Sequence, residues 1–450
     1  MAKINNILST VKTIFKGSDI PPNPHKRPSK SVIHYLLQIF DTLHDPREEF
    51  KVIYPLSYII TLALLAILGN ANTWQEIYGF CVSSSKWLKK YLPIEKYGIP
   101  SHDTFNRVFG LIEHSQLQQI VVNIILNNIE CLKRKLGITP SKDSLRLLNI
   151  DGKYENGTGR KNIVKRFGGV PNMAMLNIYD SSNAICVASM PINEKTNEIP
   201  VAQEILKTMD LTNTLCTFDS LHTQKETIEA IHNNNGHYVA ALKGNQDTLH
   251  DLAIQCFSEK FCDKLRDSRV TKKPKYLFSE EYNHSQFNLR EYFIVKVPKD
   301  AKQVADWPGL KTFVMCKKEC IKKDLAPERK SIEELIKDDI SETRYFISDL
   351  DDLELISEAI RAHWGVEIFH WHLDVSFSQD DNTTMNRNSF ANLDLLIHMV
   401  LHLLKLMQTT DKTMSVKRLR MSYGWNFEDN LRKLLTLFDT DAIISALSCC

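Results

Sequence analysis

The chain has 450 residues, of which 43% are hydrophobic and 24% are charged. This is the composition of a folded globular protein of two or three domains, which excludes a disordered chain, a collagen-like chain and a coiled coil. Lys and Arg (56) nearly balance Asp and Glu (54), so the overall charge points to neither nucleic acid nor membrane. Positive charge is concentrated at 1–40, with six Lys or Arg against one acid, and at 131–170, with ten against three. Such stretches indicate either phosphate contact or ordinary solvated surface.

The ten cysteines are scattered, without a CxxC pair or a zinc-binding pattern. Cysteines of this kind are typical of a reducing compartment, so we expect a cytoplasmic protein. The apolar run Tyr58–Leu68 has about 11 residues, well short of the ~20 that a membrane-spanning helix needs. Pro55 precedes this run and Gly69 follows it. The sequence therefore predicts a buried core helix there, and no membrane association.

The first ~145 residues are predicted to be helical almost throughout. The predicted helices lie at 57–68, at 74–80 after a capping box formed by Thr73 and Glu76, at 102–109 after the N-cap Ser101, and at 116–136 between the N-cap Ser115 and Gly137. Several short helices with a basic edge suit a helix-turn-helix DNA-binding module. They suit a plain helical bundle equally well.

From Leu145 the hydrophobic pattern changes to that of strands. Predicted strands lie at 147–151, 173–179, 184–190, 214–218 and 238–242, with helices at 198–209 and 223–231. The order strand-strand-strand-helix-strand-helix-strand, with nearly continuous apolar strands, predicts a mixed α/β sheet flanked by helices.

Residues 260–347 differ again, because charged loops separate short strand-like runs at 276–278, 292–297, 311–315 and 343–347. This pattern predicts a β-rich insertion. Asp351–Phe377 is predicted to be one long helix, and 392–406 and 427–437 are predicted to be helical. We therefore divide the chain into a helical N-terminal domain (1–145), the first part of an α/β core (146–259), the insertion (260–347) and the C-terminal helices of the core (348–450).

Two acids, Asp151 and Asp219, each directly follow a predicted apolar strand. In open α/β sheets, ligands bind at the carboxyl ends of the strands. Two neighbouring carboxylates repel each other unless a cation lies between them, and oxygen-only ligands suit Mg²⁺ or Mn²⁺. The alternative is that both are ordinary turn residues at strand ends.

Four polar residues share one face of the predicted long helix, since they recur at i, i+4, i+7 and i+11: His363, Glu367, His370 and Asp374. If this face is turned towards the sheet, it is costly unless it binds something. An exposed polar helix face is one alternative. A zinc hydrolase is another, because His and Glu side chains can bind zinc, although the HExxH motif is absent.

Segments along most of the chain match a known family in its order. They are His44–Arg47, Trp74–Ile77, Gly98–Phe109, Ile150–Lys153, Glu194–Pro200, Thr217–Ser220 with Gln224, Leu242–Gln246, Arg361–Glu367 and Leu373–Phe377. With these segments the chain resembles the insertion-sequence transposases related to the H-repeat-associated proteins (ISAs-type), a branch of the DDE transposases with an RNase H-like catalytic domain.

This resemblance implies that Asp151, Asp219 and Glu367 are a catalytic triad that binds two Mg²⁺ ions, or Mn²⁺ in their place. It implies that 260–347 is inserted between the second and third acids. The residues expected to contact DNA are Lys153, Lys243, Arg361 and His363. These last assignments depend on the resemblance. Lys243 also follows a predicted strand and precedes Gly244, where a lysine can reach a backbone phosphate or can be an ordinary surface residue in a turn.

The implied function is metal-dependent DNA end cleavage and strand transfer by in-line phosphoryl transfer. The expected partners are double-stranded DNA, as terminal inverted repeats and as target, and a second copy of the chain in a homodimer. We expect a cytoplasmic, nucleoid-associated location. Because Ser220 and Ile368 differ from the residues usual in the family, an inactive copy or a derived DNA-binding repressor stays an alternative. A metal-dependent nuclease of the RNase H type is another.

Overall fold

The structure is a computed structural model that describes residues 30–135, 145–159, 171–192, 197–267, 274–283, 286–298, 300–322, 340–410 and 414–428. Gly137, residues 194–196, most of the helix predicted at 427–437 and parts of both basic stretches lie outside these ranges. The chain forms two compact units. Unit 1 consists of Met1–Lys142, Gly152–Thr196 and Glu367–Cys450, and unit 2 of Asp143–Asp151 and Asn197–Val366. The division into four parts stays a prediction.

Unit 2 is built on a mixed sheet with the strand order β1-β4-β5-β9-β8-β7-β6. The strands are β1 (Arg146–Glu155, which continues into unit 1 after Asp151), β4 (Thr214–Phe218), β5 (His237–Leu242), β6 (Tyr276–Asn283), β7 (Gln286–Lys296), β8 (Thr312–Lys322) and β9 (Ile340–Ser348). Strands β1, β4 and β5 are parallel, and each strand from β9 outwards is antiparallel to its neighbour.

The core of unit 2 lies where helices cover this sheet. The helices are α9 (Glu198–Thr208), α10 (Lys225–Asn233), α11 (Asp247–Cys256), α12 (Glu259–Arg266) and α14 (Leu353–Ala362). Helix α14 packs against β4, β5, β6 and β7, and every residue of β4 is buried. This arrangement confirms the predicted mixed sheet with flanking helices.

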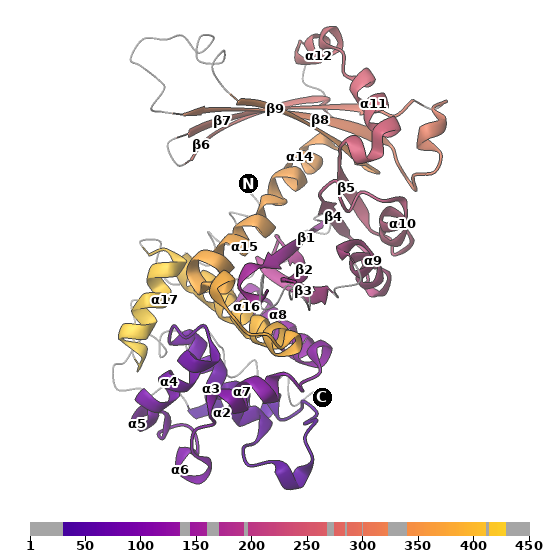
Figure 1. Cartoon of the computed structure of the whole chain (residues 1–450). Coiled ribbons are helices and arrows are strands. Elements are labelled where there is room, and N and C mark those ends of the chain that lie inside the picture. Colours follow the sequence, from indigo (N-terminus) through magenta and orange to yellow (C-terminus); the bar gives the residue numbers. More distant parts are fainter. Residues whose placement is uncertain are drawn as a thin grey trace, which may run out of the picture. The chain divides into compact units, whose positions relative to one another are not determined.

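The strands predicted within the insertion are all present, but they are longer than the apolar runs that indicated them. Antiparallel strands β6–β9 lie beside α11 and α12 (Figure 1). Charged residues occupy cross-strand positions on the extended parts, for example Glu291 opposite Lys317 and Arg290 opposite Lys318. Such positions carry no hydrophobic signal, although their backbones pair fully. Strand β9 pairs with β5, so the insertion prolongs the central sheet rather than forming a separate one.

Unit 1 is mainly helical and also contains the antiparallel pair β2 (Met173–Asp180) and β3 (Ile185–Ile192). Its helices are α2 (Lys30–Phe40), α3 (Leu56–Leu68), α4 (Trp74–Ser83), α5 (Ser85–Leu88), α6 (Ile94–Tyr97), α7 (His102–Phe109), α8 (His114–Lys135), α15 (Trp364–Phe377, in this unit from Glu367), α16 (Arg387–Thr410) and α17 (Val416–Trp425). The helical N-terminal region is thereby confirmed. A role of this region in DNA binding stays a prediction.

Two apolar helices form the centre of unit 1. Every residue of α3 is buried, which confirms the predicted core helix. Helix α16 packs on α3, α7, α8, α17 and β3. It is long and apolar enough to cross a membrane by length and composition alone, but 89% of its apolar window is buried inside the protein. Both helices therefore serve as core.

Two of the predicted N-caps are confirmed, while α8 begins at His114, ahead of the predicted cap Ser115, and α10 begins after Gln224 rather than at Thr223. The Thr73 side chain accepts from the Glu76 N–H while Glu76 accepts from the Thr73 N–H, and Ser101 caps α7. The prediction of one helix over 351–377 is wrong, because the helix is interrupted at His363, between α14 and α15. Gly365, which disfavours helix by about 1 kcal/mol, lies two residues after the interruption.

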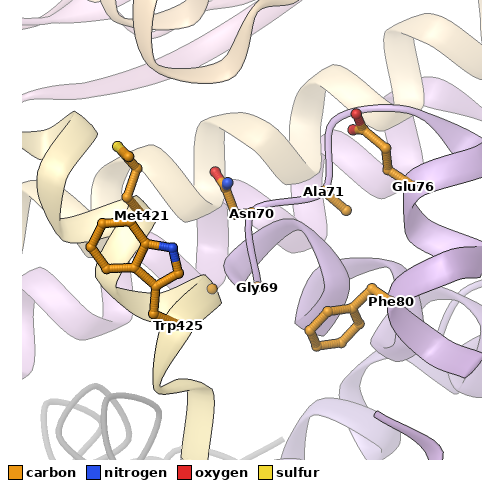
Figure 2. Close-up of a pocket in the computed structure, with 8 residues that line it drawn as sticks. Gly69, Asn70, Ala71, Glu76, Phe80, Met421 and Trp425 are labelled. Atoms are coloured by element: carbon orange, nitrogen blue, oxygen red, sulfur yellow. The ribbon is translucent and has the colours of Figure 1, made fainter. Parts of the chain in front are cut away.

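Unit 1 also has a shallow pocket of about 380 Å³ between α17 and the α3–α4 connection. Figure 2 shows Trp425 and Met421 on one side and Phe80 on the other. Next to Met421 in the chain, the buried Arg420 donates to the Ala71 carbonyl at 3.0 Å, and its guanidinium carbon lies 3.9 Å from the Phe377 ring centroid. This guanidinium joins α17 to the chain ahead of α4.

Candidate active site

Asp151 and Asp219 lie side by side in unit 2. Strands β1 and β4 are parallel, with Ile150 in register with Phe218, so the two acids occupy the next position on adjacent strands. Neighbouring strands are about 4.8 Å apart, and side chains in register point to the same face. Both residues are half-buried. Their carboxylates can therefore be reached by a cation from solvent.

The two acids differ in their local backbone. The prediction that β1 ends at Asp151 is wrong, because the strand continues to Glu155. The sequence misses this continuation because its buried positions, Lys153 and Glu155, are charged. Asp219 does end its strand, and its Oδ1 accepts from the backbone N–H of Leu221 at 3.0 Å and of His222 at 3.3 Å. This turn leaves Oδ2 of Asp219 outside these two bonds.

A chain of hydrogen bonds lies behind the two acids. Asn149 and Thr217 are in register two positions before Asp151 and Asp219, and the Asn149 Nδ2 donates to the Thr217 Oγ1 at 2.5 Å. The same hydroxyl lies 3.0 Å from Nδ1 of His363. Burial lowers the pKa of His363 to about 4, and the nearby negative charge of Asp219 only partly opposes this. His363 is thus neutral at physiological pH, and the Thr217 hydroxyl holds its ring through Nδ1.

Lys243 lies at the same edge of the sheet, directly after β5. Its side chain is exposed. The loop that follows, η3 (Gly244–Gln246), is tied to the loop after β4: Asn245 Nδ2 donates to the Ser220 carbonyl at 2.6 Å, and Gln246 Nε2 donates to the Thr223 carbonyl at 3.0 Å. Because β4 and β5 are parallel neighbours, Lys243 is close to the Asp219 turn.

Arg361, on α14, forms a close ion pair with Glu281 of β6. The same carboxylate pairs with Arg290 of β7 at 3.0 Å. Two guanidinium groups thus share one carboxylate, so these three side chains together carry one positive charge.

Glu367 and Lys153 belong to unit 1. Glu367 is exposed on the first turn of α15. Lys153 is only 6% exposed, and its Nζ lies 2.8 Å from Glu155, 2.9 Å from Asp374 and 3.8 Å from Asp380. Burial alone would lower the pKa of Lys153, but the charges and hydrogen bonds of Glu155 and Asp374 outweigh it and raise the pKa. The ammonium is therefore held charged inside the protein.

Sequence reasoning missed this cluster around Lys153. The sequence places Asp374 on the helix face of Glu367 and in the family segment Leu373–Phe377, but it does not single out Glu155 or Asp380. The two available signals were the alternation of Lys153 and Glu155 on one strand face and the Asp374 spacing of seven residues from Glu367.

Comparisons with known proteins show the family of the chain. Residues 151–403 match the family described as Transposase DDE domain, and residues 37–125 match the domain described as DDE_Tnp_1-associated. "Putative transposase YncI" of Escherichia coli O157:H7 is 30% identical over 88% of this chain and 93% of its own. "H repeat-associated putative transposase YhhI" of E. coli K12 is 28% identical over 84% of this chain and 91% of its own.

Among solved structures, the cryo-EM structure of the piggyBac transposase synaptic complex with hairpin DNA aligns with a TM-score of 0.34 and 14% identity, over 94% of this chain and 82% of that one. This likeness is too distant to carry detail. The family match begins at Asp151 and spans more than half of the chain, and it includes Asp219, Lys243 and α15. The chain therefore belongs to the DDE transposase family, with an RNase H-like α/β core.

Proposed function

We propose that Asp151, Asp219 and Glu367 are the three catalytic carboxylates of this transposase. The observation that carries the proposal is the register of the parallel strands β1 and β4, which puts Asp151 next to Asp219 at the carboxyl end of β4. Ligands of open α/β sheets bind at this edge. Glu367 is supported by its exposure at the start of α15 and by its place in the matched family segment.

The donor set fits a hard divalent cation. Carboxylate oxygens are the ligands that Mg²⁺ and Mn²⁺ prefer, whereas zinc sites favour His and Cys. The use of a divalent metal follows from the family. We propose two Mg²⁺ ions, held by Asp151, Asp219 and Glu367. Such a pair supplies Lewis-acid stabilisation of the attacking and leaving oxygens of an in-line displacement.

The remaining residues are proposed to bind and orient DNA. Lys243 is exposed beside the Asp219 turn, where its ammonium can pair with a backbone phosphate. His363 is neutral and can serve only as a hydrogen-bonding group. Arg361 is paired with Glu281, so we assign it only a supporting contact with DNA. The sequence predicts a DNA contact for Lys153 as well, but its side chain is only 6% exposed, and we do not assign it that contact.

We further propose that the DNA is the element's terminal inverted repeat and then a target duplex. Cleavage by water frees a 3′-hydroxyl that attacks the target. Because two ends must be held together, we propose a homodimer. A cytoplasmic, nucleoid-associated location follows from the substrate and stays a prediction.

The experiment that tests the function uses a duplex with the terminal repeat. We expect the wild type to nick its 3′ end and join it to target DNA in Mg²⁺, but not with EDTA. Glu367→Gln removes one negative charge at an exposed position and should abolish both products. Nicking without joining would favour a nuclease, and specific binding without nicking would favour an inactive copy or a repressor.

Lys243→Ala is expected to weaken binding to all duplexes alike, because a phosphate contact does not depend on sequence. The plot of log affinity against log salt concentration should become shallower by about 1. Filter binding or fluorescence anisotropy at several salt concentrations measures both. Lys207→Ala, an exposed lysine on α9, is the matched control and should leave the slope unchanged. An unchanged slope for Lys243→Ala would remove Lys243 from the DNA-binding surface.

A further inference from the structure

The most unusual charged group of unit 1 is Lys153 on β1. Its side chain is 6% exposed and is surrounded by three carboxylates, those of Glu155 on the same strand, Asp374 on α15 and Asp380 in η6 (Gln379–Asp381). Lysine is almost never buried in proteins unless it is paired. Burying a charge is costly, so this lysine needs its acids, and the acids need it.

A bound metal is not needed to explain the cluster. Oxygens of Glu155, Asp374 and Asp380 lie within 4.8 Å of one another, a spacing that could suit a cation. The ammonium of Lys153 already supplies that cation, at 2.8 and 2.9 Å from the first two. The cluster is therefore an internal ion-pair network rather than a second metal site.

The ion pair between Lys153 and Asp374 links two segments that carry proposed catalytic acids. Lys153 lies two residues after Asp151 on β1, and alternate residues of a strand share one face. Asp374 lies seven residues after Glu367 on α15, which is two helical turns along the same face, about 10 Å. One ion pair thus joins the strand that carries the first catalytic acid to the helix that carries the third.

A second attachment supports the first. Beyond the end of α15, Asp380 accepts from the backbone N–H of Asn156 at 3.2 Å and from its Nδ2 at 3.0 Å. Asn156 follows directly after β1. The end of β1 is therefore attached at two points to the segment that begins with Glu367. Rotation of α15, or sliding along its axis, would break the ion pair of Lys153 with Asp374.

We propose that Lys153 is a positioning residue, whose ion pair with Asp374 holds α15 at the height and rotation that present Glu367 to the catalytic metals. The inference rests on the proposed function of the triad. Lys153 itself touches neither metal nor DNA. Supporting groups around metal ligands commonly change metal affinity or activity by about 10- to 100-fold when they are lost.

The test compares Lys153→Met, which keeps the length and removes the charge, with Lys153→Arg and Asp374→Asn. Lys89→Met is the matched control, because Lys89 forms an exposed ion pair with Glu95 at 2.7 Å in the same unit. Four quantities are measured: thermal unfolding, terminal-repeat binding without metal, Mn²⁺ binding by electron paramagnetic resonance, and the Mg²⁺ concentration for half-maximal nicking.

We expect Lys153→Met and Asp374→Asn to raise the half-maximal Mg²⁺ concentration and to weaken Mn²⁺ binding by about 10-fold or more. Metal-free DNA affinity should stay within about twofold, Lys153→Arg should recover most of the loss, and Lys89→Met should behave as wild type. If Lys153→Met does not fold, the charge-swapped double variant Lys153→Glu with Asp374→Lys replaces it. Recovery of Mn²⁺ binding in that double variant supports the proposal.

Three results overturn the inference. A folded Lys153→Met with wild-type Mg²⁺ and Mn²⁺ dependence shows that the pair positions nothing. Weaker DNA binding without metal shows that Lys153 contacts phosphate instead. A folded double variant that does not recover excludes the pairwise mechanism. A wild type that binds its DNA but never nicks it contradicts the proposed function instead, which distinguishes the two failures.

Discussion

Asp219→Asn is expected to lower Mg²⁺-dependent nicking of the terminal repeat by about 10⁴-fold, as is typical when one member of a catalytic unit is removed. Asparagine keeps the Oδ1 that accepts from the N–H groups of Leu221 and His222, so the turn after β4 stays intact. What is lost is the negative charge beside Asp151, and with it the tight binding of a divalent cation. The effect is therefore chemical rather than structural.

Asp151→Asn should have the same effect, and the double variant with both substitutions should lose little more than either single one. Residues that act as one unit are strongly non-additive. Rates are measured by single-turnover nicking of a labelled duplex, and metal-free DNA affinity by anisotropy. Glu204→Gln, an exposed acid on α9, is the control and should nick like wild type. If the losses in nicking rate were additive, Asp151 and Asp219 would not act together in one catalytic site.

The second large effect concerns stability. Asp394 and His398, one turn apart on α16, form a buried ion pair of 3.0 Å with 2% and 4% of their side chains exposed. Burial by itself lowers the pKa of His398, but Asp394 outweighs it and raises the pKa to about 10. Asp394→Asn leaves a buried histidine without its counter-charge. We expect unfolding to become easier by about 3–5 kcal/mol at pH 6.

The pH dependence of this pair has a defined sign. Because the folded pKa of His398 lies above its unfolded value of about 6.5, its contribution is complete below that pH and is lost as the pH rises towards about 10. The pKa of Asp394 is lowered, so its contribution is lost only at acid pH. Urea midpoints at pH 6, 8 and 10 should show the difference between wild type and Asp394→Asn shrinking as the pH rises. Glu95→Gln, in an exposed pair, is the control, and a constant difference would contradict a charged His398.

The sequence predicts best what depends on neighbouring residues. The capping box of Thr73 and the cap at Ser101 need only residues three positions away, and α3 is recognisable because it is apolar on every side. The sequence indicates Asp151 and Asp219 because each follows an apolar run. The two acids are neighbours because β1 and β4 are adjacent parallel strands.

What the sequence could not show depends on distant partners. The extension of β1 to Glu155 is hidden because Lys153 and Glu155 resemble surface residues until Asp374 and Asp380, more than 200 residues later, are brought to them. The helix interruption at His363 is not visible in the sequence either, because the ring of His363 is hydrogen-bonded to Thr217 on the distant strand β4. Such contacts are properties of the fold, not of any local pattern.

The pairing of β5 with β9 has a consequence for synthesis of the chain. Leu242 ends β5 and Ile340 begins β9, so 97 residues (243–339) separate the two strands that must pair. At about 5–20 residues per second, a ribosome needs roughly 5–20 s to supply the missing neighbour. Throughout that interval one edge of β5 is unpaired and open to other chains. A copy truncated anywhere within the insertion would keep this open edge permanently and is expected to aggregate rather than persist as a soluble competitor of the full-length protein.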